Sequence, residues 1–408
     1  MENLPVEIIK LIVNYCDFMT RVRLTQINHF YYDNYPIIDL LNIPQLIKSK
    51  LSNIVIQSYP HCQYLYASDR NSIDQQGILG MLKLKILNCD DNWNIKNVNH
   101  LTNLEILHAG DTCGIDQKGI SDLCKLKELK CDDNFQIENV NHLTNLQILH
   151  AAWTCGIDHK GISDLCQLKE LWCRGNNRIK NVGHLTNLEV LDVDLDNGYL
   201  SPVKQEEIVN LFKLRELYCG GNNMINSVNH LTRLEILNAS DDCGIDQNGI
   251  LHVYKLKRLD CSDNINITNV NHLTNLEVLN VDDDCGIDQN GISDLYQLRK
   301  LYCCDNRVIT NVNHLTCLEI LHADWSCIDQ QGIQNLTQLR KLSCYDNSNI
   351  NEVNHLINLE VLNAGGRESG IYQQGIQNLT KLRKLSCRQN SKINEVDHLT
   401  NLEVFLWQ

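Results

Sequence analysis

The sequence predicts an α/β repeat solenoid with a small helical module in front of it. One leucine recurs at a nearly constant interval, since Leu104, Leu146 and Leu188 are 42 residues apart. The same series continues with Leu234, Leu276, Leu318, Leu359 and Leu402. Each interval divides into two half-repeats with a common apolar pattern. Such regularity indicates stacked units that each bury a face against their neighbours.

The first half-repeat reads L-x-x-L-x-C-x-x-N-x-x-I-x-x-V, as over residues 126–140. Its asparagine falls where the chain must turn inward. A buried amide there can satisfy backbone groups of adjacent coils. We therefore expect a tight turn held by a column of asparagines. This column comprises Asn92, Asn134, Asn176, Asn222, Asn264, Asn306, Asn347 and Asn390.

The second half-repeat reads L-x-x-L-x-A followed by C-G-I-D-Q-x-G-I, as over residues 104–120. Its aspartate is placed to cap a helix, which we expect over residues 116–126. Equivalent aspartates are Asp116, Asp158, Asp246, Asp288 and Asp329. We expect the second half-repeat to return through this short helix.

Both half-repeats resemble the leucine-rich repeat family, over roughly residues 59–408. The resemblance implies a horseshoe with a parallel concave sheet and with helices and turns on its convex side. We place the solenoid at 62–408, with about 17 coils of family length. Residues 37–61 form a transition with a first irregular strand, placed at 51–57. The segment C-G-I-D-Q-x-G-I-x-x-L looks like the cysteine-containing type of repeat, common behind F-boxes.

Residues 1–36 do not follow the repeat. Their apolar residues 4, 8, 11, 12 and 15 share one face of a predicted helix, and a second helix is expected from Thr20. The spacing resembles the start of an F-box, which binds the Skp-type adaptor of a cullin-RING ubiquitin ligase. The tryptophan usual near the end of that pattern is absent. The residues that match adaptor-binding positions are Leu4, Pro5, Glu7, Ile8, Ile12, Leu24 and Ile27. These helices could instead only cap the solenoid.

The net charge of −14 and pI of 5.5 argue against nucleic acid or an anionic membrane as partner. No signal-peptide pattern or membrane-length apolar run occurs. Most of the nineteen cysteines fall into an inward strand column and a turn column. Members of one column are about 10 Å apart, too far for a disulfide. We therefore expect buried reduced thiols and a cytoplasmic or nuclear protein.

The histidines before a leucine, such as His100 and His142, form another column. Zinc needs ligands clustered around one ion, so we expect a structural role in the turn, with no metal and no cofactor. The residue after the first leucine alternates between basic and acidic in successive coils, as in Lys127 and Glu105. We expect a ladder of ion pairs that salt weakens.

Residues either side of the inward Cys or Ala should point to the concave face, because strand side chains alternate. Those columns are acidic and contain aromatic residues suited to anchor a protein partner. An acidic face favours a basic protein or peptide. The predicted partner-binding residues are Trp153, Trp172, Tyr218, Tyr302, Trp325, Tyr345, Asp132, Asp133, Asp263, Asp282 and Asp305. The insertion at 196–207 is either a tolerated loop or a further partner contact.

We expect no enzyme, because candidate Cys, His and Asp residues recur in columns and no catalytic motif occurs. The predicted function is that of a substrate-recognition subunit of an Skp-cullin-F-box ubiquitin ligase, monomeric outside the complex. The alternative is a leucine-rich repeat scaffold or decoy that recruits no ligase. Duplicated units behind an F-box-like start also look like paralogous families of giant DNA viruses, which would place the protein in host-cell cytoplasm.

Overall fold

The computed structural model describes residues 16, 20–22, 37–68, 72–195 and 203–407. The chain forms two compact units, residues 1–188 and 189–408, and each is described by itself. The residues predicted to bind the adaptor, from Leu4 to Ile27, lie outside the described residues, as does 196–202 of the insertion. Among the described residues, no helix has the length and apolarity needed to cross a bilayer.

Each unit is a parallel sheet with one short strand per coil. The first unit contains β1 (Asp39–Leu40), β2 (Tyr64–Tyr66), β3 (Ile86–Asn88), β4 (Ile106–His108), β5 (Glu128–Lys130), β6 (Ile148–His150) and β7 (Glu170–Trp172). Each of these strands pairs with the next one in sequence, and all pairs are parallel. The predicted solenoid is therefore confirmed in this unit.

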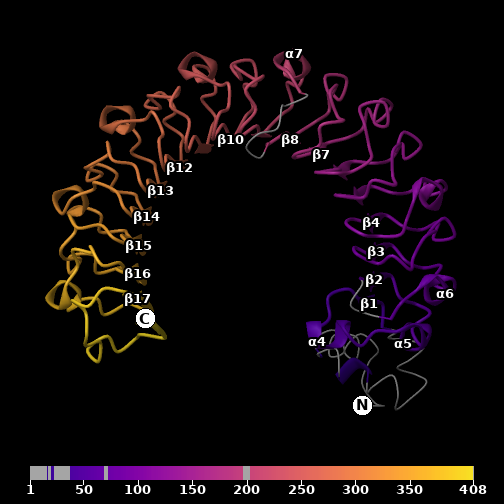
Figure 1. Cartoon of the computed structure of the whole chain (residues 1–408), viewed down its shortest axis with the longest axis horizontal. Helices are drawn as coiled ribbons and strands as arrows, with labels where there is room; N and C mark the ends of the chain where they lie inside the picture. The colour runs from indigo at the N-terminus through magenta and orange to yellow at the C-terminus, as the bar shows by residue number, and fades with distance from the viewer. Residues whose placement is uncertain (1–15, 17–19, 23–36, 69–71, 196–202, 408) are drawn as a thin grey trace, which may run out of the picture. The chain divides into compact units, whose positions relative to one another are not determined.

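The second unit continues the pattern. It contains β8 (Val190–Asp192), β9 (Glu216–Tyr218), β10 (Ile236–Asn238), β11 (Arg258–Asp260), β12 (Val278–Asn280), β13 (Lys300–Tyr302), β14 (Ile320–His322), β15 (Lys341–Ser343), β16 (Val361–Asn363), β17 (Lys384–Ser386) and β18 (Val404–Leu406). Pairing is again parallel between neighbours in sequence. Within each unit the strands line one side, and the labelled turns α6 (Gln75–Ile78) and α7 (Gln205–Ile208) lie on the other (Figure 1).

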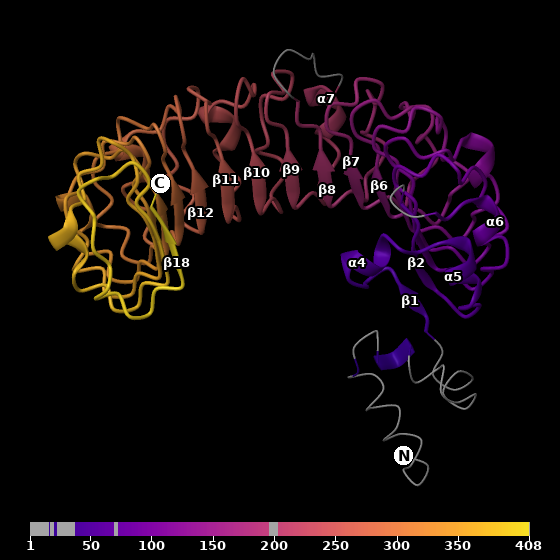
Figure 2. The same ribbon diagram turned by 60° about the horizontal axis from the view of Figure 1, so that its bottom comes forward.

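The helical turns are short. The first unit has α4 (Gln45–Lys48), α5 (Asn53–Gln57), α6 (Gln75–Ile78) and the 3-10 turn η1 (Gln117–Ile120). The second has α7 (Gln205–Ile208), which lies in the insertion, and the 3-10 turns η2 (Gln247–Ile250), η3 (Gln289–Ile292), η4 (Gln331–Ile333) and η5 (Gln373–Ile376). Figure 2 shows α6 and α7 on the side away from the strands.

For the helix predicted over residues 116–126, the predicted N-cap is confirmed and the predicted length is wrong. Asp116 accepts hydrogen bonds from the backbone N–H groups of Lys118 and Gly119, both at 2.9 Å. The 3-10 turn then ends at Ile120, and Leu123 and Leu126 are buried beyond it. In the part of the solenoid that the structure describes, the helical turns have three to five residues and are shorter than the convex helices that the resemblance implied.

The strand expected over residues 51–57 is also wrong. Residues 53–57 form helix α5, and its Ile56 is buried. The first strand lies earlier, at β1, whose Asp39 and Leu40 stand opposite Tyr64 and Leu65 of β2. Residues 37–61 therefore do contain an irregular strand, at a different place from the one predicted.

The asparagine column is confirmed: all eight side chains are buried. The Asn134 amide donates to the carbonyl oxygens of Ala109 at 2.8 Å and Ile115 at 3.1 Å, both in the preceding coil. Its own oxygen accepts from the backbone N–H of Gln136 at 3.0 Å. One side chain therefore joins two coils and closes the turn, as the sequence predicts.

A second polar column, formed by the glutamine of C-G-I-D-Q-x-G-I, was not predicted. Gln117 donates from Nε2 to the Asn139 carbonyl at 2.7 Å and accepts from the N–H groups of Glu138 and Asn139. Gln75, Gln205, Gln247, Gln289, Gln330 and Gln373 make the same kind of contact with the following coil. These bonds join each of these second half-repeats to the coil after it.

The histidine column has the structural role predicted for it. His142 Nε2 lies 3.0 Å from the carbonyl oxygen of Ile120 in the preceding coil, so the imidazole donates a hydrogen bond. His100, His184, His230, His272, His314 and His355 make the equivalent contact. This carbonyl contact occupies Nε2 in each of these coils.

The cysteines are all free, as expected. However, cysteines of the strand column contact cysteines of the turn column. The spacing within one column does not reveal this contact. Sγ of Cys131 lies 3.6 Å from Sγ of Cys155, because the strand cysteine of one coil abuts the turn cysteine of the next. The same contact joins Cys89 to Cys113, Cys219 to Cys243 and Cys261 to Cys285. The separation of about 10 Å therefore holds within a column and not between the two.

Ion pairs join neighbouring coils as the alternation of charge predicts. Lys127 Nζ lies 2.6 Å from Glu105, and Arg340 lies 2.7 Å from Glu360. Further pairs are Arg215–Glu235, Lys257–Glu235, Arg299–Glu319 and Arg383–Glu403. Their side chains are partly exposed, so salt should screen them.

Candidate functional site

The candidate site is the solvent-facing side of the strands, which we call the strand face. Each coil contributes four residues to this face, three of them alternating along the strand and the fourth directly after them. The coil of β13 illustrates this arrangement. Lys300 precedes the buried Leu301 and belongs to the first row, Tyr302 to the second, and Cys304 to the third. Asp305 follows at once and forms the fourth row, at the turn that leaves the strand. The rows run across successive strands because the strands are in register.

The fourth row adopts a left-handed backbone. Its members have positive φ, such as Asp263 at 55° and Asp305 at 52°. Asp and Gly suit this region better than other residues, because a bulky side chain crowds the backbone there. The two large exceptions are Trp153, with φ of 57°, and Trp325, with φ of 52°. Such conformations persist where the surrounding structure imposes them and are concentrated at functional sites.

The six predicted aromatic residues all lie on the strand face. Trp172, Tyr218 and Tyr302 end their strands in the second row. Tyr345 stands in the third row, and Trp153 and Trp325 stand in the fourth. Tyr218 is engaged within its own strand, since its hydroxyl donates to Glu216 at 2.9 Å. The other five group around two places, one in each unit.

In the first unit, Trp172 stacks on His150 with ring centroids 5.5 Å apart. Burial and the charge of Lys130 lower the pKa of His150 to about 4, so the imidazole is neutral at pH 7. Next to this pair, the guanidinium of Arg174 lies over the Trp153 ring at 5.6 Å. This group therefore already contains a cation on an aromatic face.

In the second unit, Tyr302 packs against His322 at 4.9 Å and Trp325 against Tyr345 at 5.1 Å, both edge to face. Trp325 is 49% exposed and so presents apolar surface to solvent. Burial also lowers the pKa of His322, with the charge of Lys341 acting in the same direction. Four rings gather here on three consecutive strands.

Two of the predicted aspartates are hydrogen-bond acceptors for the next coil. Asp132 accepts from the Ala152 N–H at 2.7 Å, and Asp282 accepts from the Cys304 N–H at 2.6 Å. Burial raises the pKa of both carboxyl groups, that of Asp282 to about 6. Asp133 also binds the next coil, by accepting from the Thr154 hydroxyl at 2.8 Å. These three contribute to stacking as well as to charge.

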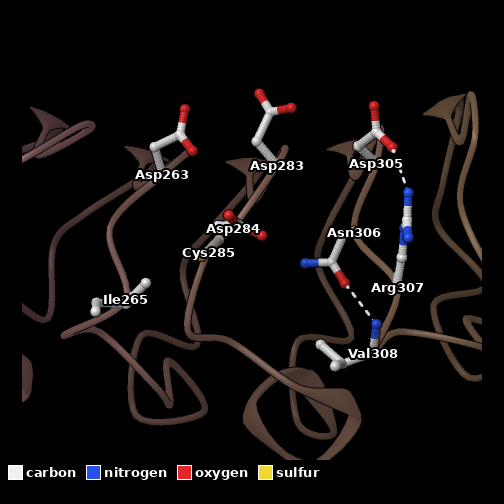
Figure 3. Close-up of a pocket in the computed structure, with 9 residues that line it drawn as sticks. All are labelled: Asp263, Ile265, Asp283, Asp284, Cys285, Asp305, Asn306, Arg307 and Val308. Carbon is white, nitrogen blue, oxygen red and sulfur yellow. Dashed lines mark hydrogen bonds and ion pairs between the residues drawn. The ribbon is translucent and has the colours of Figure 1, made fainter.

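The other two predicted aspartates line a shallow acidic pocket of about 790 Å³ at the ends of β11 to β13. Asp263, Asp283 and Asp305 point the same way from successive turns (Figure 3). Ile265 and Val308 supply apolar walls, and both are exposed. Desolvation and the neighbouring carboxylates raise the pKa of Asp283. Asp305 pairs with Arg307 at 3.7 Å.

The prediction of a strongly acidic face left out the first row. In the second unit that row carries Glu216 in β9 and is basic in alternate coils from β11 onward. Its members there include Arg258, Lys300, Lys341 and Lys384. In the first unit the same row carries Glu128 and Glu170. Extending the alternation of strand side chains by one more step would have found these residues. From β11 onward, the face of the second unit is therefore basic where alternate strands begin and acidic where strands end.

No protein-family model matches the chain, and a comparison with curated proteins found no match. Among solved structures, the functional domain of InlJ from Listeria monocytogenes, described as including a cysteine ladder, is similar with a TM-score of 0.54. It is 22% identical, over 81% of this chain and 75% of that one. Internalin InlF from the same bacterium is 18% identical, with 87% and 88% covered and a TM-score of 0.45.

A leucine-rich repeat protein of Leptospira interrogans is 16% identical, over 82% of this chain and 98% of that one, with a TM-score of 0.45. With one parallel strand in each short coil, the similarity to InlJ shows that the chain has the leucine-rich repeat fold. The solenoid expected from the half-repeats is thereby confirmed.

Proposed function

We propose that the chain is a protein-interaction receptor that holds a protein or peptide target on its strand face. The observation that carries this proposal is the pair of tryptophans, Trp153 and Trp325, in left-handed backbone where other coils use Asp, Gly or Gln. Both are large and partly exposed. Rigid aromatic area of this kind supplies much of the binding energy at protein interfaces.

The target is expected to be basic, at least in the part that meets the strand ends. The fourth row and the acidic pocket present carboxylates there, and the chain carries a net charge of −14. Opposite charge speeds encounter and disfavours wrong partners. The basic first row of the second unit favours an acidic or neutral segment over the other end of the strands. The free, mostly buried thiols favour a reducing cytoplasm or nucleus.

Within this role, we propose recognition of a substrate for a ubiquitin ligase. The support is the F-box-like spacing of residues 1–36, with Leu4, Pro5, Glu7, Ile8, Ile12, Leu24 and Ile27 as adaptor contacts. The receptor would act by positioning its target, and other subunits would perform the transfer. The alternative is a scaffold or decoy whose first helices serve as a cap.

Binding at the strand face can be tested with peptides selected from a random display library on the purified chain. Tyr302→Ala removes a strand-face ring, while Tyr296→Ala removes an exposed ring from the turn that precedes β13, outside the four rows. We expect the selected peptides to be basic and to lose affinity with Tyr302→Ala alone. Equal losses in the two variants, or a loss only with Tyr296→Ala, would contradict the proposal.

Ligase recruitment is tested separately by a pull-down with purified Skp-type adaptor. Wild type is compared with a chain lacking residues 1–36 and with Leu4→Ala/Pro5→Ala. We expect adaptor to bind the wild type and neither variant, with unchanged circular dichroism of the solenoid. Absence of binding to the wild type would leave the scaffold alternative.

A further inference from the structure

We propose that the Trp325–Tyr345 pair is a receptor site for an arginine side chain of the bound target. This inference rests on the proposed function, since it names the chemistry that one part of the strand face recognises. Trp325 lies in the fourth row between Asp305 and Asp346, which have φ of 52° and 51°. The site therefore combines two aromatic rings with carboxylates on the coils before and after it.

The first unit shows which group contacts the ring of a tryptophan in this row. Trp153 stands in the fourth row of its coil, as Trp325 does, and its backbone N–H donates to the Arg174 carbonyl at 2.8 Å. The Trp325 N–H makes the same bond with the Tyr345 carbonyl at 2.9 Å. Arg174 and Tyr345 are thus equivalent positions on the following coil. In the first unit the chain itself supplies the guanidinium, 5.6 Å from the ring.

The second unit replaces that arginine with an aromatic residue. Among the described residues of this unit, no cation lies over the Trp325 ring. Trp325 is also more exposed than Trp153, at 49% compared with 39%. The edge-to-face contact with Tyr345, at 60°, covers only part of the tryptophan surface. Trp325 is therefore exposed like Trp153, but no described side chain of its own unit supplies the cation that Arg174 supplies to Trp153.

The neighbouring charges favour a cation. The position that follows Arg174 is Gly175, which the Trp153 ring covers closely. After Tyr345 the same position is Asp346, whose carboxylate accepts one hydrogen bond, from the Glu368 N–H at 2.8 Å. On the preceding coil, Asp305 opens toward the acidic pocket. Asp305 already lies 3.7 Å from Arg307, so Asp346 is the carboxylate that a guanidinium on the rings would meet. The planar shape of the guanidinium suits both the rings and that carboxylate.

The test measures binding of a fluorescent hexa-arginine peptide to the full chain by polarisation. Trp325→Asp installs the residue that other coils use in the fourth row, so the backbone should be retained and negative charge is added. Tyr345→Arg places an arginine where the first unit has Arg174. Its guanidinium should lie over the Trp325 ring and so block binding of the peptide's arginine there. Circular dichroism checks that each variant is folded.

Two matched controls separate the site from the general charge of the face. Trp153→Asp makes the same exchange in the first unit, where Arg174 already covers the ring. Asn363→Arg adds the same positive charge as Tyr345→Arg on neighbouring strand β16. We expect about a tenfold loss of affinity with Trp325→Asp and Tyr345→Arg, and less than about a twofold change with either control.

Two results would overturn the inference. One is unchanged affinity of the Trp325→Asp and Tyr345→Arg variants, and the other is an equal loss in Trp153→Asp. In either case the proposed function is tested separately, by the affinity of the selected peptides for the wild type and for Tyr302→Ala. If those peptides depend on Tyr302 while hexa-arginine ignores Trp325, only the arginine site is refuted.

Discussion

At the scale of single residues, buried polar side chains join one coil to the next. The amide of Asn134 serves three backbone groups, and the carboxylate of Asp282 serves one. A buried polar group that loses its hydrogen-bond partner lowers the stability of the folded state. A partly buried charge also lowers it, because burial removes the charge from water. These two residues therefore predict opposite effects of mutation.

Replacing Asn134 by alanine should destabilise the chain strongly. The change leaves the buried carbonyls of Ala109 and Ile115 and the N–H of Gln136 without their partner. At about 1 to 3 kcal/mol for each unsatisfied group, we expect a loss of about 3 kcal/mol or more. Urea unfolding measures it. Asn145→Ala, which removes an exposed amide bonded to the Cys124 carbonyl, is the control and should cost far less.

Replacing Asp282 by asparagine should stabilise the chain at neutral pH. Burial raises the pKa of this carboxyl to about 6, above the value of about 3.9 expected when unfolded. The folded state therefore binds the proton more tightly, and wild type loses stability as pH rises from about 4 to about 6. Asparagine does not ionise and keeps an acceptor for Cys304.

The gain should be about 1 kcal/mol at pH 7, since partial exposure of Asp282 reduces the effect of the shift. It should be absent near pH 4, where wild type is protonated in the folded state. Unfolding free energies of both proteins between pH 4 and 7 provide the measurement. A difference that does not change with pH would contradict the assignment.

At the scale of elements, the C-G-I-D-Q-x-G-I turn is built around close backbone approach. A Cβ on Gly114 would lie 2.4 Å from the Trp93 carbonyl oxygen, and one on Gly119 would lie 2.3 Å from that of Lys96. Coils can stack at this distance only if neither position carries a side chain. Gly114 and Gly119 are therefore required by the stacking of this coil, while Asp116 and Gln117 supply its bonds.

Two glycine substitutions in the first unit test this reading. Gly119→Ala forces the Lys96 carbonyl away and should cost about 1 to 3 kcal/mol. Gly80→Ala meets nothing within 4 Å and should be neutral or stabilise by up to about 1 kcal/mol. Thermal unfolding of both variants distinguishes a packing requirement from a general intolerance of alanine, which would lower both melting temperatures.

At the scale of the whole molecule, the cysteines divide by exposure. Cys124, Cys166 and Cys317 are exposed, while the strand column lies in the core. The contact with Cys155, together with burial, raises the pKa of the Cys131 thiol well above the ordinary value. Burial raises the pKa of Cys303 in the same way, so the reactive thiolate is disfavoured at both positions.

Brief treatment of the native protein with iodoacetamide should therefore label Cys124, Cys166 and Cys317 first. The strand column should react only when the solenoid opens, and fully in denaturant. Peptide mass spectrometry after different labelling times provides the rates. Rapid labelling of Cys131 or Cys303 in the native protein would show that the core is not closed as described.

The repeat made much of this fold predictable. In a solenoid each coil meets only its neighbours, so a column in the sequence becomes a row of contacts in space. The roles of Asn134 and His142 and the pairing of Lys127 with Glu105 follow from periodicity alone. The aromatic residues of the strand face could also be read from the alternation of strand side chains.

Other features depend on how one coil lies against the next, which periodicity does not specify. The contact of Cys131 with Cys155, the length of η1 and the left-handed backbone of Trp325 arise from this stacking. So does the placement of Arg174 over Trp153, from which the arginine site is inferred. A linear pattern records which residues recur, whereas the register and separation of coils decide which of them touch.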